Sequence, residues 1–146
     1  MPFVSPLINL ISVKFPKDKE LYTRGVLPLL KPDDSFSYEE LVCRLQKDIC
    51  AWWVINEGKV VGWCSAGNSP YIAGAIHLYG FCIWPEHRGR GFGTKALLAR
   101  LAIYRGRAIT TSIQKDSKVS LHLAEKLGFE YLNTIVPWDN FVLYQN

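Results

Sequence analysis

The sequence predicts a single α/β domain, and three observations lead to that prediction. An apolar and aromatic run over residues 76–84 has the composition of a buried strand, and it passes through the glycines of residues 89–93 into an amphipathic helix. Strand and helix patterns alternate in the order strand, helices, three strands, helix, strand, helix, two strands. The 146 residues can bury a core without disulfides or metals, so we expect residues 1–146 to form one domain.

Local signals mark the individual elements. Ser37 followed by Glu40 is a capping box, and apolar residues recur every four positions after it. Residues 56–58 predict a hairpin turn, and Ser117 is the expected N-cap of the last helix. The expected strands are 3–13, 51–55, 60–65, 75–84, 108–113, 129–136 and 141–144, with turns at 32–35 and 138–140. The expected helices are a short one within 17–30, one over 38–47, one over 92–105 burying Leu97, Leu98, Leu101 and Ala102, and one ending at Leu127.

Composition narrows the possible classes of protein. The net charge of +4 suits an anionic ligand, but no basic block points to nucleic acid. The four cysteines show no C-x-x-C spacing, so we expect reduced thiols in a cytoplasmic protein, with neither a zinc site nor disulfides. Neither a secretory signal nor a membrane-length apolar run is present in the sequence, and we expect no membrane partner.

The glycine-rich turn is typical of a phosphate-binding site. Amides of a first helical turn have no partner inside the helix, the helix dipole favours an anion there, and glycine lets the ligand approach. The turn reads Arg88-Gly89-Arg90-Gly91-Phe92-Gly93, which matches neither the GxxxxGK[ST] loop nor the GxGxxG fingerprint. It resembles the R/Q-x-x-G-x-G/A signature of the GCN5-related N-acetyltransferases (GNAT). Residues 83–87 are similar to the V-x-P-E-x that precedes this signature in the family, and the later LAEKLGF at 123–129 resembles the family's L-Y-E-K-L-G-F.

The resemblance implies a fold, a cosubstrate and a set of binding residues. The fold would be a central mixed, mostly antiparallel sheet, splayed at its fourth and fifth strands, with helices on both faces. The cosubstrate would be acetyl-CoA, with its pantetheine arm along the fourth strand and its pyrophosphate on the glycine turn, and no metal. The implied cofactor-binding residues are Phe81, Cys82, Ile83, Arg88, Gly89, Arg90, Gly91, Phe92, Gly93, Thr94 and Ser117.

Three residues are candidates for proton transfer. His77 and Tyr79 alternate onto one face of the fourth strand, where the similar arylalkylamine N-acetyltransferases carry histidines, and a histidine titrates near neutral pH. His77 could equally be a packed histidine with one hydrogen bond. Ser120 stands where ribosomal-protein N-terminal acetyltransferases carry a serine, and Ala124 replaces the tyrosine of many members; Ser120 could also be only a local backbone partner.

Other residues of reactive or aromatic type have plainer interpretations. We expect His87 and His122 to lie on the surface and Cys82 not to act as a nucleophile. Trp138, in an expected turn, is a candidate for lining an acceptor pocket.

These observations favour an N-acetyltransferase that moves an acetyl group from acetyl-CoA to a primary amine by direct attack in a ternary complex. The acceptor could be a small molecule, a lysine or a protein N-terminus, and the protein a monomer or a homodimer. One alternative is an acyl-CoA-binding module of the same fold with weakened catalysis. Another is a basic nucleic-acid-binding protein that uses the arginines of the turn and of the following helix.

Overall fold

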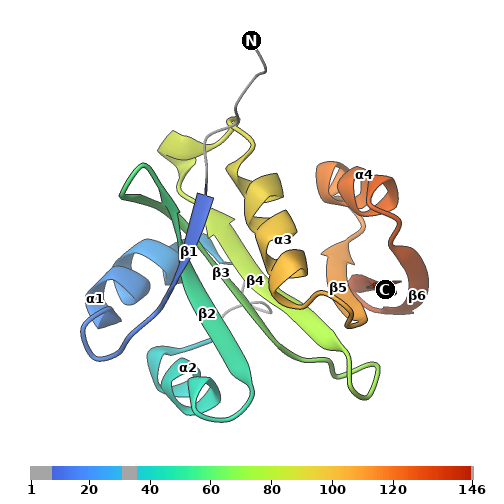
Figure 1. The fold of residues 1–146 in the computed structure, drawn as a ribbon, viewed down its shortest axis with the longest axis horizontal. Helices are drawn as coiled ribbons and strands as arrows, with labels where there is room; N and C mark the ends of the chain where they lie inside the picture. The colour runs from blue at the N-terminus through green and yellow to red at the C-terminus, as the bar shows by residue number, and fades with distance from the viewer. Residues whose placement is uncertain (1–7, 31–35, 146) are drawn as a thin grey trace. The chain divides into compact units, whose positions relative to one another are not determined.

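The strands form a seven-stranded mixed sheet in the order β1-β2-β3-β4-β5-β7-β6. Figure 1 labels strands β1 to β6 along the chain. The computed structural model describes residues 8–30 and 36–145. Within them the strands are β1 Ile8–Ser12, β2 Ile49–Asn56, β3 Lys59–Asn68, β4 Ile76–Ile83, β5 Ile109–Gln114, β6 Glu130–Ile135 and β7 Trp138–Leu143. The helices are α1 Lys19–Leu21, the π-turn η1 Tyr22–Val26, the 3₁₀ turns η2 Leu27–Leu29 and η4 Pro85–His87, α2 Tyr38–Leu45, α3 Phe92–Ile103 and α4 Lys118–Lys126.

Residue contacts divide the chain into two compact units that share strands β3 and β4. The first unit holds the residues up to Ala66 together with Gly80–Ile103, and the second holds Gly67–Tyr79 together with the residues from Tyr104 onward. The mixed α/β class predicted from the sequence is confirmed, because β4 and β5 pair in parallel over Ile76–Leu78 while β5 and β7 pair antiparallel. That residues 1–146 act as one domain stays a prediction.

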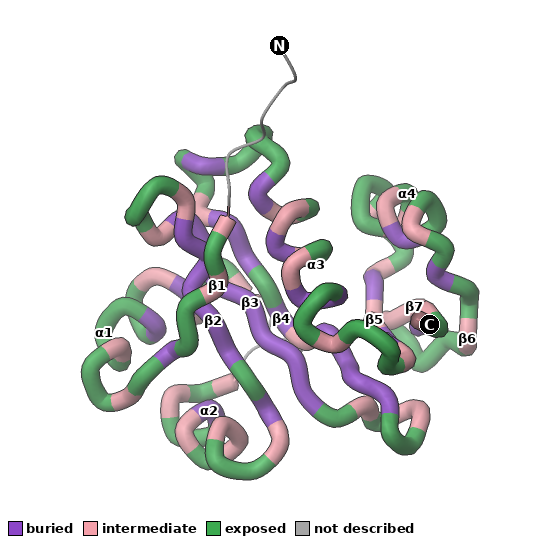
Figure 2. The backbone as a smooth tube through the Cα atoms, viewed as in Figure 1, coloured by how far each residue is buried: buried purple, intermediate pink, exposed green. Residues whose placement is uncertain are grey.

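The first unit is built on the β2–β3 hairpin. β1 pairs antiparallel with β2, from Ile8 opposite Asn56 to Ser12 opposite Trp52. The turn is made by Glu57 and Gly58, both with positive φ (50° and 76°), as a two-residue hairpin turn requires. The predicted hairpin is therefore confirmed. Figure 2 shows long buried stretches on β2, β3 and β4, and Trp63 of β3 is fully buried against Tyr22.

Helix α2 begins as the sequence predicts. The Ser37 hydroxyl accepts a hydrogen bond from the Glu40 amide at 3.1 Å, which is the N-cap half of a capping box. The helix ends at Leu45, two residues before the expected end. The predicted strand start at residues 3–7 and the predicted turn at 32–35 lie outside the described residues.

Helix α3 buries a different face from the one predicted. The expected stripe included Leu98 and Ala102, but both are exposed, and the buried positions are Phe92, Ala96, Arg100 and Leu101. The helix carries apolar residues on several sides, so its sequence period does not select one face. Contact with the sheet selects it, because the Arg100 guanidinium donates to the carbonyl of Ser65 at 3.0 Å.

The second unit contains β5, α4, β6 and β7. The predicted turn at residues 138–140 is wrong, since these residues form the start of β7 and the chain reverses at Val136–Pro137. Pairing decides the difference: Trp138 lies opposite Gln114, and Asn140 lies opposite Ser112. Ser117 occupies the N-cap of α4 as predicted, but its side chain makes no capping hydrogen bond.

No helix in the described part of the chain is long and apolar enough to cross a membrane. Those residues also contain no cluster of three or more His, Cys, Asp or Glu side chains that could hold a metal ion.

Candidate functional site

The glycine turn lies between β4 and α3, as its sequence predicts. Gly89 and Gly91 both have φ of +80°, a conformation that side chains other than glycine rarely adopt. A Cβ atom at either position would meet nothing within 4 Å, so the turn faces open space. The Lys95 amide bonds to the Gly91 carbonyl at 3.1 Å, which makes Gly91 the residue before the first helical turn. The amides of Phe92, Gly93 and Thr94 consequently have no acceptor inside the helix.

The two arginines of the turn have different surroundings. Arg88 bends back to the end of β4, where its Nε donates to the carbonyl of Ile83 at 2.9 Å. Arg90 lies between the two positive-φ glycines and is exposed. Arg88 thus connects the turn to the end of β4 by a side-chain hydrogen bond. Arg88 and Arg90 both add positive charge beside the start of α3.

The second half of β4 presents an aromatic ring next to this helix start. Phe81 is 42% exposed, although it lies in a strand whose other residues are mostly buried. A Cβ atom on Gly93 would lie 3.2 Å from the Phe81 ring, so glycine is what allows the ring to rest on the helix. The Arg100 guanidinium lies 5.7 Å from the centre of the same ring, within cation–π range.

Cys82 and Ile83 complete this part of β4 and are buried. Burial raises the pKa of the Cys82 thiol to about 11, against a smaller lowering by Arg88. A thiol with such a pKa is protonated at neutral pH, which agrees with the expectation that it is not a nucleophile. β3 comes unusually close here, because a Cβ atom on Gly62 would collide with the Cys82 carbonyl oxygen.

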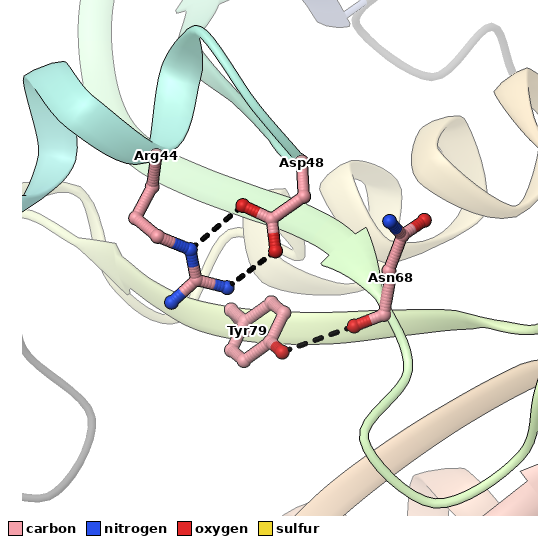
Figure 3. A network of polar contacts seen from close by, with 4 residues as sticks. All are labelled: Arg44, Asp48, Asn68 and Tyr79. Atoms are coloured by element: carbon pink, nitrogen blue, oxygen red, sulfur yellow. Dashed lines mark hydrogen bonds and ion pairs between the residues drawn. The ribbon is translucent and has the colours of Figure 1, made fainter.

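The first half of β4 carries His77 and Tyr79 in the second unit. His77 is 5% exposed, and its Nδ1 lies 2.7 Å from the hydroxyl oxygen of Thr110. Burial lowers the pKa of His77 to about 4. The Tyr79 ring lies edge-on to the imidazole of His77, with 4.6 Å between the two ring centres. The Tyr79 hydroxyl donates to the Asn68 carbonyl at 3.1 Å (Figure 3).

Figure 3 also shows the ion pair between Arg44 and Asp48 at the C-terminal end of helix α2. Arg44 contacts both carboxylate oxygens of Asp48, at 2.7 and 2.9 Å. Hydrogen bonding from Arg44 lowers the pKa of Asp48. The pair is four residues apart at the helix end, so it has a local structural role.

The remaining candidates lie on α4 and beside the glycine turn. Ser120 is exposed on α4, and the side chain of Ala124 is buried one turn later. His122 is exposed, as predicted. His87 is buried, contrary to the prediction, because the 3₁₀ turn that starts at Pro85 folds it inward, with its amide bonded to the Trp84 carbonyl. Trp138 is half-buried in β7 rather than in a turn.

The structure thus brings the predicted cofactor residues from Phe81 to Thr94 together in the first unit, and it places His77, Tyr79, Ser117 and Ser120 in the second. Sequence reasoning missed the burial of Arg100, the buried polar side chains of Thr110 and Asn140, and the half-buried Ser112. Alternate polar residues in the run AITTSI at 108–113 were the available signal for two of them.

The sequence profile of the acetyltransferase (GNAT) family matches residues 19–129. The chain belongs to this family. It is therefore an acyltransferase of the GNAT type, and its mixed sheet with parallel β4 and β5 is the GNAT fold. No curated protein sequence matches the chain.

Solved GNAT structures share this fold along nearly their whole length. An acetyltransferase from Thermus thermophilus has a TM-score of 0.69 and 21% identity, over 97% of this chain and 99% of the other. The PaiA N-acetyltransferase from Thermoplasma acidophilum, solved with coenzyme A, has a TM-score of 0.69 and 16% identity, over 94% and 99%. The spermidine N-acetyltransferase from Vibrio cholerae, solved with CoA and spermine, also has a TM-score of 0.69 and 16% identity, over 94% of each chain.

Proposed function

We propose that this GNAT protein transfers the acetyl group of acetyl-CoA to a primary amine by direct attack within a ternary complex. The observation that carries the proposal is the open glycine turn at the start of α3, with Gly89 and Gly91 at φ of +80° and nothing within 4 Å of an added Cβ. A diphosphate fits such a turn because amides and positive charge converge on it.

The residues present suit each part of the cosubstrate. The amides of Phe92, Gly93 and Thr94 would bind the pyrophosphate, assisted by the cations of Arg88 and Arg90. The backbone of β4 at Phe81, Cys82 and Ile83 would pair with the pantetheine arm, as the family resemblance implies. Ser117, at the start of α4, is the remaining proposed contact to that arm.

Acetyl-CoA supplies a thioester: the amine nitrogen bonds to its carbonyl carbon, the carbon–sulfur bond breaks, and the sulfur leaves as a thiolate that takes up a proton. The protein must orient the two reactants and accept the proton that the amine loses. The roles predicted for His77, Tyr79 and Ser120 in this proton transfer stay predictions. A covalent acetyl-cysteine step through Cys82 is disfavoured by its raised pKa.

Primary amines are the proposed class of acceptor. Among proteins of this fold, the Vibrio cholerae spermidine acetyltransferase was solved with a polyamine, which supports an amine nucleophile but not a particular one. We also propose that the protein works in the cytoplasm as a monomer or a homodimer. A CoA-binding module with weakened turnover is the second candidate, and the buried Ala124 favours it, because many family members carry a tyrosine there.

Calorimetric titration with acetyl-CoA tests the cofactor site. We compare the wild type with Gly91→Glu, whose added carboxylate would occupy the open turn and repel the diphosphate. Gly106→Glu is the matched control, because Gly106 also has positive φ (+85°) and nothing within 4 Å of an added Cβ, but lies after α3. Both variants therefore carry a similar backbone strain.

We expect wild type and Gly106→Glu to bind acetyl-CoA and Gly91→Glu to lose at least tenfold in affinity. A folded wild-type protein that binds no CoA would contradict the proposed site. Binding without release of CoA across a panel of amines would instead support the binding module.

A further inference from the structure

A row of polar side chains crosses four strands of the second unit on one face of the sheet. His77 of β4 lies opposite Thr110 of β5, and Ser112 of β5 lies opposite Asn140 of β7. Asn140 in turn lies opposite Asn133 of β6. Thr110 and Asn140 are 0% exposed and His77 is 5% exposed, so the polar groups of these three side chains need hydrogen-bond partners inside the protein.

The hydrogen bonds at one end of the row have a fixed direction. Ser69, in the segment between β3 and β4, accepts from the amides of Tyr71 and Ile72 at 3.1 and 3.3 Å. Both lone pairs of its hydroxyl oxygen are then used, so its single hydrogen is donated to the Thr110 oxygen 2.7 Å away. Thr110 therefore donates its own hydrogen to Nδ1 of His77, also at 2.7 Å.

The other end of the row reaches the same result independently. Ser112 donates to the side-chain oxygen of Asn140 at 2.5 Å, and the Asn140 amide donates to Asn133 at 2.8 Å. With its hydrogen used in this way, Ser112 can only accept from Nε2 of His77, at the long distance of 3.5 Å. Nε2 therefore carries the hydrogen and Nδ1 carries none.

We infer that His77 is held as the neutral imidazole protonated on Nε2, and that it is a positioning residue joining β4 to β5 rather than the base that takes the proton of the acceptor amine. Protonation would place a hydrogen on Nδ1 facing the hydrogen of Thr110, and the buried Thr110 hydroxyl would have to turn its hydrogen away from Nδ1 and lose that acceptor. Within the described residues, the titratable side chains whose rings pack against the imidazole are the phenols of Tyr71 and Tyr79, at 5.5 and 4.6 Å between ring centres.

Burial acts in the same direction as the hydrogen bonds, because it lowers the pKa of His77 to about 4. This inference rests on the proposed function only for its reference to the acceptor amine. It follows that the amine loses its proton to another group or arrives neutral.

The decisive experiment is ¹⁵N NMR of the histidine rings in the wild-type protein, over about pH 5.5 to 8.5, the range in which an ordinary histidine changes charge. The chain has three histidines, and the spectrum of His77→Asn identifies the signals of His77. We expect a bare Nδ1 and a protonated Nε2 whose shifts stay constant across this range. A hydrogen on Nδ1, or a titration midpoint between about pH 6 and 7, would overturn the inference.

Substitutions at Thr110 and at His77 test whether these hydrogen bonds hold the imidazole neutral and whether His77 acts as the base. Thr110→Val removes the hydrogen that caps Nδ1, so we expect the His77 signals to titrate at a higher pH than in the wild type. His77→Asn keeps an acceptor near the Nδ1 position, and with an identified acceptor amine it should retain the pH profile of kcat/KM, whereas His77→Leu should lower the rate. Loss of the acidic limb of that profile in His77→Asn, where the rate rises with pH as a base loses its proton, would assign the base to His77. The NMR result does not depend on acetyl transfer, so failure of the proposed function would leave it intact.

Discussion

The buried His77 should make folding stability depend on pH in a way that one substitution removes. The pKa of His77 is about 4 in the folded protein, against 6.5 for an ordinary histidine. Above the higher value neither the folded nor the unfolded chain holds a proton on this ring. Below it the unfolded chain takes up a proton that the folded protein does not, so stability falls as the pH falls towards about 4.

The size of the effect follows from the interval between the two pKa values. One pKa unit corresponds to about 1.4 kcal/mol, so the whole interval is worth about 3 kcal/mol. Between about pH 7.5 and pH 4.5 the loss is about 2.5 kcal/mol, which is a large part of the 5–15 kcal/mol typical of a domain.

The assay is urea unfolding of the wild type and of His77→Asn at several pH values in this range. Asparagine does not titrate, so the variant should be less stable at neutral pH but should lose about 2.5 kcal/mol less than the wild type on acidification. His122→Asn is the matched control, because its ring is exposed to solvent in the folded protein as in the unfolded chain. The three proteins have the same Asp and Glu residues, so the titration of these carboxylates contributes equally to each stability curve and cancels in the comparison. Parallel stability curves for wild type and His77→Asn would refute the reasoning.

Two further predictions concern other parts of the chain. Ser37→Ala should lower the free energy of unfolding by about 1 kcal/mol, because the Ser37 side chain caps α2. Ser117→Ala should lower it by less, because the Ser117 side chain makes no capping hydrogen bond. Equal losses of stability in urea unfolding would contradict this difference. A thiol reagent at about pH 8 should quickly modify the exposed Cys43 and Cys50. The buried Cys64 and Cys82, whose thiol pKa values are raised, should react only when the protein unfolds. Rapid modification of a third thiol would show that the β3–β4 region opens.

The sequence alone determined the elements whose signals are local. The capping box at Ser37, the positive-φ hairpin turn at Glu57 and Gly58, and the glycine turn before α3 each depend on a few neighbouring residues. A cap or turn restricts the backbone wherever it occurs, so its position can be read without the rest of the fold. The family resemblance rested on one such turn and one helix end, and the family match confirms it.

Tertiary contacts decided what local patterns leave open. Pairing with β5 drew Trp138 to Asn140 into β7, although their composition suits a turn. Contact with the Ser65 carbonyl turned Arg100 of α3 inward in place of Leu98. The protonation of His77 depends on Ser69, Thr110 and Ser112, which lie 8 to 35 positions away and meet it only through strand pairing. A hydrogen bond's direction is set by what its partners already donate and accept, and that information exists only once the strands are side by side.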